Sequence, residues 1–123
     1  MRSGNIVIIE DENDLASALK DALEGRGYVV RVALRGEEGL ELVKKERPDL
    51  ILLDLVLPDM TGIDILRELQ PMRAEKHIPV IILSNLDNPD DLKEAREYNI
   101  EEYLIKTDWK LEDVIARIKE AIK

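Results

Sequence analysis

The chain of 123 residues contains no cysteine and no phenylalanine, and it has only one tryptophan and three tyrosines. The lack of cysteine excludes disulfide bonds and thiolate metal sites, and it fits a reducing compartment. Because aromatic side chains are scarce, the core must be built from isoleucine, leucine, valine and alanine. Hydrophobic residues make up 45% of the sequence, which is enough for a proper core. We therefore expect residues 1–123 to form one domain.

Basic residues are also in short supply, because 18 lysines and arginines face 27 acids and the net charge is −9. Such a surface repels phosphate backbones and anionic lipids, so we expect this chain to bind neither nucleic acid nor membrane. The longest apolar segment, residues 50–57, is interrupted by Asp54 and is too short to cross a bilayer. No signal-like segment opens the sequence. We expect a cytoplasmic protein.

Apolar segments alternate five times with segments of helical periodicity, which predicts a parallel sheet with helices on both faces. Gly25 ends the first helix, Pro71 is expected to break the third, Asn88 caps the fourth and Asp108 caps the fifth. The fourth helix has a thin apolar face and should be the least firmly packed. The predicted strands cover 5–9, 28–34, 50–54, 80–83 and 102–105, and the predicted helices include 36–46 and 62–70. The second and fifth strands are interrupted or short, which suits edge positions.

Acidic side chains close two of the apolar segments. Asp54 ends the third strand, and Glu10 and Asp11 follow the first. A carboxylate at the end of a buried strand is costly unless its charge is needed there. The flavodoxin-like strand order 2-1-3-4-5 makes the first and third strands neighbours, and open sheets of this class bind ligands at the carboxyl ends of their strands. We therefore predict a flavodoxin-like, three-layer α/β fold whose three carboxylates converge.

These residues suggest phosphoryl chemistry that depends on a metal ion. Aspartate can attack a phosphoryl group and carry it, which makes Asp54 the candidate nucleophile. Carboxylate oxygens with positions left for water and phosphate describe a Mg²⁺ site, and without metal the acids should repel one another and raise at least one pKa. Ser84 follows the fourth strand and Lys106 the fifth, so both should reach the same edge and contact the phosphoryl oxygens.

Together these features resemble the receiver domains of two-component response regulators, including the chemotaxis receiver. The resemblance covers essentially the whole chain. The residues that carry it are Glu10, Asp11, Asp54, Pro58, Gly62, Ser84 and the segment Tyr103-Leu104-Ile105-Lys106.

The resemblance implies a role for each of these positions. Asp54 would accept a phosphoryl group from a phosphohistidine on a sensor histidine kinase or a histidine phosphotransfer protein, and Lys106 would hold that group. Ser84 and Tyr103 would be the switch residues that remodel the face of the fourth helix, fifth strand and fifth helix. The Mg²⁺ ligands would be Glu10 (through water), Asp11, Asp54 and the backbone carbonyl of Val56. Such a protein catalyses only its own phosphorylation and dephosphorylation and is otherwise not an enzyme.

The resemblance also implies partners downstream of phosphorylation. They would be a separate protein or a fused output domain, and phosphorylation could drive dimerisation. Since the sequence ends at Lys123, we expect either a single-domain regulator or part of a longer one.

Several positions depart from the family pattern. Glu10 stands where aspartate is commoner, Asn85 where a small residue is usual, and Thr107 where a proline usually follows the lysine in a cis bond. The segment 98–102 replaces a Gly-Ala pair, although Asn99 tolerates a left-handed conformation. These departures leave a receiver-like module that docks without phosphorylation as the alternative function.

Val56 and Leu86 are apolar and would flank the path of an attacking water, so we expect slow loss of the phosphoryl group. Val56 also bears on another alternative, a Mg²⁺ phosphatase of haloacid-dehalogenase type, because that chemistry needs a second aspartate at position 56. We expect His77 to be solvated rather than a phosphodonor.

Overall fold

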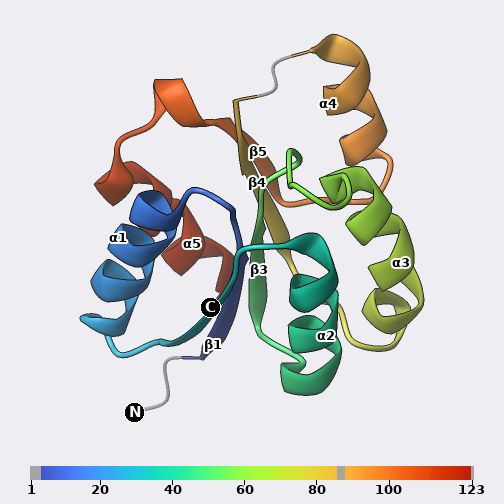
Figure 1. The fold of residues 1–123 in the computed structure, drawn as a ribbon. Coiled ribbons are helices and arrows are strands. Elements are labelled where there is room, and N and C mark those ends of the chain that lie inside the picture. Colours follow the sequence, from blue (N-terminus) through green and yellow to red (C-terminus); the bar gives the residue numbers. More distant parts are fainter. Residues whose placement is uncertain (1–3, 86–87, 123) are drawn as a thin grey trace.

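The computed structural model describes residues 4–85 and 88–122, in which strands and helices alternate along the chain (Figure 1). In chain order the elements are β1 (Asn5–Ile9), α1 (Asn13–Glu24), β2 (Val29–Ala33), α2 (Gly36–Glu46), β3 (Leu50–Leu53), α3 (Gly62–Glu75), β4 (Val80–Ser84), α4 (Pro89–Arg96), β5 (Glu102–Ile105), a 3₁₀ turn (Lys106–Asp108) and α5 (Leu111–Ile122).

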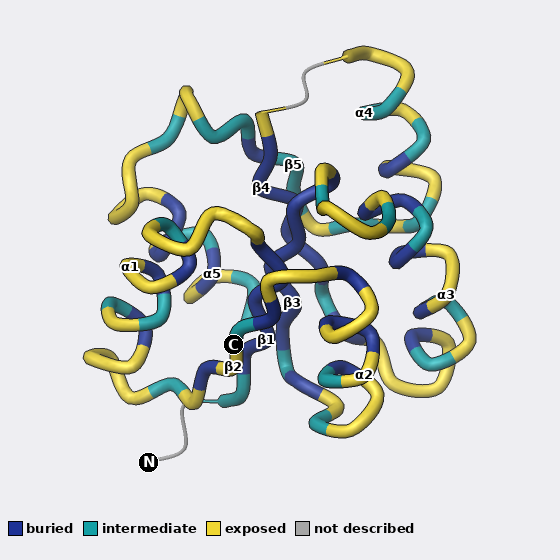
Figure 2. The backbone as a smooth tube through the Cα atoms, viewed as in Figure 1, coloured by how far each residue is buried: buried dark blue, intermediate teal, exposed yellow. Residues whose placement is uncertain are grey.

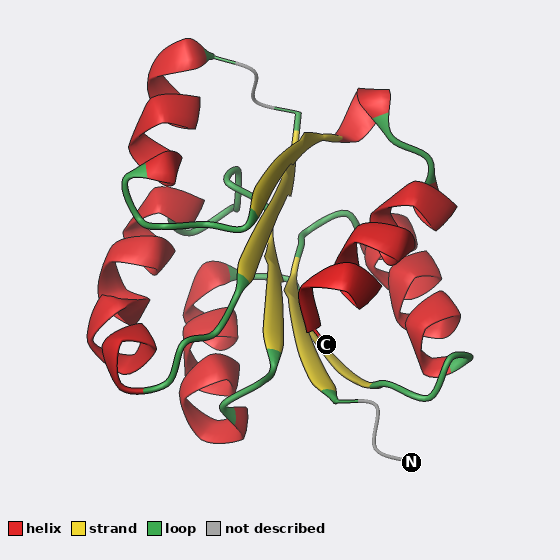
Figure 3. Ribbon diagram, turned by 180° about the vertical axis from the view of Figure 1, so that it is seen from behind, coloured by secondary structure: helices red, strands yellow, loops and turns green. Residues whose placement is uncertain are grey.

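The five strands form one parallel sheet in the order β2-β1-β3-β4-β5, as the sequence predicted. β2 and β5 lie at the edges. Viewed from behind, helices cover both faces of the sheet (Figure 3). Helices α1 and α5 pack on one face, and α2, α3 and α4 pack on the other (Figure 1). The predicted flavodoxin-like fold is therefore confirmed.

The core has two halves because successive side chains of a strand point to opposite faces of the sheet. In β1, Val7 and Ile9 join the cluster under α2 and α3, whereas Ile6 and Ile8 join the cluster under α1 and α5. All four side chains are at most 1% exposed. The central strands β1, β3 and β4 are almost wholly buried, the edge strands β2 and β5 are partly exposed, and exposed residues also lie on the outer sides of the helices (Figure 2). This double burial explains why the central strands read as unbroken apolar segments.

The prediction that α3 stops before Pro71 was wrong, because the helix continues to Glu75. Proline inside a helix removes one backbone hydrogen bond and costs about 3 kcal/mol. Pro71 is exposed, as is Arg67 four residues earlier, so the freed carbonyl group can be hydrated. The helix end beyond the proline is held by Arg73, whose buried guanidinium donates to the carbonyl oxygens of Ile78, Tyr98 and Asn99. This anchoring of the last turn offsets the local cost.

Two further details concern the fourth and fifth helices. Asp108 does not cap α5, because it lies in the 3₁₀ turn and the helix begins only at Leu111. Asn88 does cap α4, where its side chain accepts a hydrogen bond from the Asp90 amide at 2.8 Å. Only Ala95 of α4 is buried, as expected for the least firmly packed helix.

Among the described residues, no helix is both long and apolar enough to cross a membrane.

Candidate phosphoryl-transfer site

The carboxyl ends of four strands bring the predicted site residues together. Glu10 follows β1, Asp54 follows β3, Ser84 ends β4 and Lys106 follows β5. A cavity of about 220 Å³ opens at this edge. Its lining consists of Asp11, Glu12, Asp54, Val56, Ser84, Asn85 and Lys106.

Three carboxylates form a cluster that could hold a cation. Glu10, Asp11 and Asp54 each place one oxygen so that all three oxygens lie within 4.8 Å of one another. Glu10 and Asp54 are buried, with 2% and 4% of their surface exposed, whereas Asp11 is exposed and open to solvent. Hard oxygen ligands with open positions for water suit Mg²⁺. The donor set of this cluster therefore fits the expected metal.

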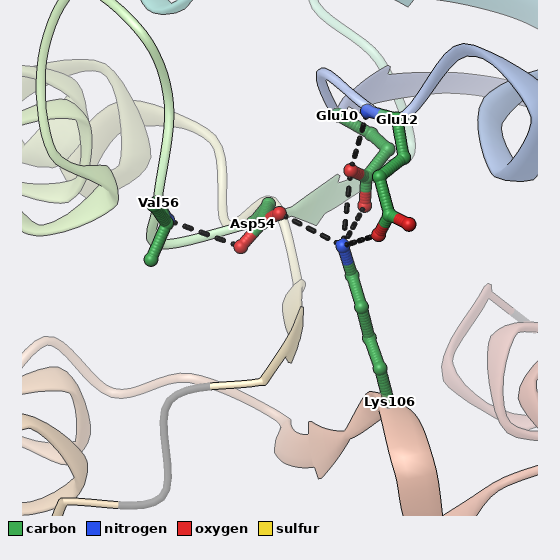
Figure 4. A network of polar contacts seen from close by, with 5 residues as sticks. All are labelled: Glu10, Glu12, Asp54, Val56 and Lys106. Atoms are coloured by element: carbon green, nitrogen blue, oxygen red, sulfur yellow. Dashed lines mark hydrogen bonds and ion pairs between the residues drawn. The ribbon is translucent and has the colours of Figure 1, made fainter.

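Lys106 is the cation that this structure places among the acids (Figure 4). Its Nζ lies 2.9 Å from Asp54 Oδ2, 2.9 Å from Glu10 Oε1 and 2.5 Å from Glu12 Oε2. The lysine side chain is only 11% exposed. Two buried carboxylates are thus compensated by one largely buried ammonium group, which is the condition under which buried charges are tolerated.

Backbone amides fix the two buried carboxylates. The Val56 amide donates to Asp54 Oδ1 at 3.0 Å, and the Glu12 amide donates to Glu10 Oε2 at 2.9 Å (Figure 4). Asp54 therefore presents one oxygen to the loop after β3 and the other to Lys106. Glu10 and Asp11 therefore do more than complement the dipole of α1. The hydrogen bond from the Glu12 amide holds the Glu10 carboxylate towards the site.

The loop after Asp54 owes its shape to Gly62. The Gly62 amide donates to the carbonyl oxygen of Leu55 at 2.9 Å, and Val56 pairs with Thr61 in an isolated bridge. A Cβ atom at position 62 would lie 2.7 Å from the carbonyl oxygen of Asp54 and 2.7 Å from the Cα of Leu55. No side chain fits so close to the backbone of the candidate nucleophile, which gives the Asp54–Gly62 spacing a physical reason.

Burial raises the pKa of Glu10 from 4.5 to about 7, although the hydrogen bonds from the Glu12 amide and from Lys106 partly oppose the shift. The charge of Asp54 also raises it, but less. Repulsion among the acids was expected to raise at least one pKa. The direction is confirmed, but desolvation is the larger cause. Burial alone would lower the pKa of Lys106, but its bonds to Glu12, Glu10 and Asp54 raise that pKa overall.

Sequence reasoning missed Glu12. It is exposed, it precedes α1, and it contacts the lysine at the other end of the chain. The only signal was a third acid after Glu10 and Asp11, and acids before a helix are common for other reasons.

The family model for the response regulator receiver domain matches residues 6–119. The chain belongs to this family. It is 33% identical over 118 residues to the DNA-binding response regulator MtrA of Mycobacterium tuberculosis, covering 96% of this chain and 50% of MtrA. The chain thus spans about half the length of the curated relatives it matches. Receiver domains of two-component systems are signalling modules whose acidic pocket binds Mg²⁺.

Two solved receiver domains have the same fold. A CheY-like receiver from Methanospirillum hungatei superposes with a TM-score of 0.88 at 26% identity, covering 96% of this chain and 92% of that chain. The BeF₃-activated N-terminal receiver domain of Klebsiella pneumoniae RstA gives a TM-score of 0.84 at 28% identity, covering 97% of this chain and 98% of that chain.

Several residues that depart from the family pattern lie at or near the site. The peptide bond between Lys106 and Thr107 is trans, and a 3₁₀ turn begins at the lysine. Asn85 is exposed and lines the cavity beside Asp54. Asn99 has a φ of 58°, which is the left-handed conformation expected for it. Leu86 lies outside the described residues.

The two predicted switch residues lie at different depths in the receiver domain. Ser84 is fully buried and lines the cavity. Tyr103 lies on β5, opposite Ile82 in register, and is half-buried against the cluster under α2, α3 and α4. Ser84 therefore lies at the cavity, whereas Tyr103 lies against the helical layer that contains α4.

Proposed function

We propose that Asp54 is the phosphoacceptor of a two-component phosphorelay. The observation that carries the proposal is a buried carboxylate at a strand end that has one oxygen on Lys106 and two further acids beside it. A carboxylate oxygen of Asp54 would attack the phosphorus of a phosphohistidine on a sensor histidine kinase or histidine phosphotransfer protein. The new oxygen–phosphorus bond would form as the bond from phosphorus to the histidine nitrogen breaks.

Glu10, Asp11, Asp54 and the backbone carbonyl of Val56 would hold Mg²⁺, with Glu10 acting through water. The metal would neutralise charge on the phosphoryl oxygens. Lys106 already donates to Asp54 and would donate to a phosphoryl oxygen there. No external substrate would be turned over, so the chain would catalyse only its own phosphorylation and dephosphorylation.

The output would pass through Ser84 and Tyr103 to the face formed by α4, β5 and α5. A hydroxyl that shifts towards the phosphoryl group would let the tyrosine move inward, which is a two-state change biased by local charge. The loose packing of α4, in which only Ala95 is buried, makes this the easiest face to remodel. The partner would be a downstream protein or a fused output domain, and dimerisation through this face would accompany phosphorylation.

We further propose that residues 1–123 act as one receiver domain in the cytoplasm. The relative MtrA is named a DNA-binding regulator, but this chain carries a net charge of −9. Any nucleic acid contact would therefore belong to an output partner rather than to this chain.

The test is to incubate the protein with Mg²⁺ and acetyl phosphate or phosphoramidate and to follow its intact mass. The expected result is one added phosphoryl group, which EDTA prevents and which the Asp54→Asn variant does not acquire. Absence of an adduct, together with absence of beryllofluoride binding, would contradict the proposal. That outcome would leave the alternative, a receiver fold that docks without phosphorylation.

A further inference from the structure

The ammonium group of Lys106 has no spare hydrogen-bond donor. It carries three N–H groups, and they face Glu10 at 3.0 Å, Asp54 at 2.9 Å and Glu12 at 2.5 Å. A phosphoryl oxygen on Asp54 can therefore reach Lys106 only if one of these carboxylates gives up its bond.

The three carboxylates differ sharply in what they would lose. The side chains of Glu10 and Asp54 are 3% and 5% exposed, whereas that of Glu12 is 57% exposed. A buried carboxylate that leaves its cation pays the full cost of an unpaired buried charge, but an exposed one returns to water. Glu12 is therefore the partner that Lys106 can release most easily.

The Glu12 side chain also does not stabilise the start of α1. Glu12 is the N-cap residue, but its side chain makes no capping hydrogen bond. Its backbone amide, not its carboxylate, holds Glu10. The side chain can leave Lys106 without loosening the helix or the buried acid.

On the basis of the proposed function, we infer that Glu12 is a displaceable anion that competes with the phosphoryl group for Lys106. In the unphosphorylated chain Glu12 occupies the outer donor of the lysine (Figure 4). In the phosphorylated chain a phosphoryl oxygen takes this donor, and the Glu12 carboxylate turns into solvent. Glu12 does not contact the phosphoryl group and acts only through Lys106, as a positioning residue. Its competition for the lysine shifts the equilibrium between the phosphorylated and unphosphorylated chain towards the unphosphorylated state.

A general effect of negative charge near the cavity must be separated from this specific competition. Asp14 offers the matched control, because it is an exposed acid in the first turn of the same helix. All three donors of Lys106 are taken by other carboxylates, so Asp14→Asn removes the same charge without changing those bonds.

The experiment titrates beryllofluoride, a phosphoryl mimic, into the wild type and the Glu12→Gln, Glu12→Ala and Asp14→Asn variants at saturating Mg²⁺. Fluorescence of Trp109, the one tryptophan, reports binding because Trp109 and Lys106 line the same small cavity. A separate Mg²⁺ titration sets the saturating concentration for each variant, and circular dichroism checks the fold.

Both Glu12 variants should bind beryllofluoride about two- to fivefold more tightly than the wild type, the range expected for loss of one partly exposed ion pair. Asp14→Asn should change the affinity for beryllofluoride by less than half of the fold-change seen in the Glu12 variants. Glu12 variants that match Asp14→Asn, or that bind more weakly than the wild type, would overturn the inference alone. A wild type that binds no beryllofluoride would overturn the inference, and it would overturn the proposed function as well if the protein also acquires no phosphoryl adduct.

Discussion

At the scale of single residues, the site is organised around one cation shared by several acids. Lys106 lies 52 residues from Asp54 and 96 from Glu10 in the sequence, yet it donates to both. The sequence could place each acid at a strand end, because an apolar segment stops there. It could not show that one lysine bridges them, since that bridge depends on how β5 lies relative to β1 and β3. The role of Glu12 was missed for the same reason.

Val56 is the residue whose chemistry should set the lifetime of the phosphoryl group. Its side chain is 54% exposed and lines the cavity beside Asp54, and an apolar group cannot orient an attacking water. We expect slow loss of phosphate from the wild type and several-fold faster loss from Val56→Asn, because an amide can hold a water molecule near the phosphorus. Decay of the phosphorylated protein, followed after removal of the donor, measures both rates. Equal rates in the two proteins would remove Val56 from this role.

At the scale of elements, most boundaries could be predicted from local patterns, and the exceptions have long-range causes. Asn88 and Pro89 start α4 as expected from their side chains alone. Pro71 misled the prediction for α3, because the contacts that extend this helix come from residues up to 26 positions away, such as Asn99. Asp108 misled the prediction for α5, because the chain after β5 first makes a 3₁₀ turn.

Arg73 fastens the end of α4 to α3. Its guanidinium donates to the carbonyl oxygens of Tyr98 at 2.7 Å and Asn99 at 3.0 Å, just beyond α4. Arg73→Lys cannot make this fork, and we expect unfolding to require about 1–3 kcal/mol less because the partly buried carbonyls of Tyr98 and Asn99 and the buried carbonyl of Ile78 lose their donor. Hydrogen exchange should also rise most in α4. The control is Arg67→Lys at an exposed arginine of α3, where the loss of stability should be clearly smaller.

Urea unfolding and amide exchange measured on both variants test this role of Arg73. A loss of stability equal to that of Arg67→Lys, or exchange that rises evenly over the chain, would contradict it.

The first turn of helix α2 is capped by Asp59, an acid more than 20 residues away in the sequence. The carboxylate of Asp59 accepts hydrogen bonds from the amides of Gly36 at 2.7 Å and Glu37 at 3.0 Å, while the local N-cap residue, Arg35, makes no side-chain cap. The Glu37 and Gly36 amides lower the pKa of Asp59 below 3.8. A lowered pKa means that the stabilisation is present above the unfolded-state value and is lost as the pH falls through the folded-state value.

Asp59→Ala should therefore lower the urea midpoint at pH 7, and the difference from the wild type should shrink as the pH falls below 3.8. Urea titrations of both proteins at several pH values measure this difference. A gap that stays constant down to low pH would mean that the charge of Asp59 does not support α2.

At the scale of the whole molecule, the parallel sheet brings the candidate metal ligands, Ser84 and Lys106 to one edge, while two separate core halves hold the layers together. The fold could be predicted because the central strands are covered on both faces and read as pure apolar segments. The loose attachment of α4 also followed from its thin apolar face. The pairing of Ser84 with Asp54 at one cavity followed from the strand order.

Metal binding should stabilise the whole chain, because a ligand that binds only the folded state adds its binding free energy to folding. We expect Mg²⁺ at ten- to thirtyfold above its dissociation constant to raise the free energy of unfolding by about 1–2 kcal/mol. Asp11→Asn should remove most of this gain, whereas Asp14→Asn should keep it. Thermal unfolding with Mg²⁺ and with EDTA provides the measurement. A full gain in Asp11→Asn would exclude Asp11 as a ligand.

The most direct test of the central claim is to locate the phosphoryl group on the chain. The protein is phosphorylated with phosphoramidate and Mg²⁺ and reduced with borohydride, which converts an aspartyl phosphate to homoserine, and its peptides are then analysed by mass spectrometry. The account predicts homoserine at position 54 and none in an Asp54→Asn control. Homoserine at another position, or unchanged Asp54 in a protein that has gained phosphate, would contradict it.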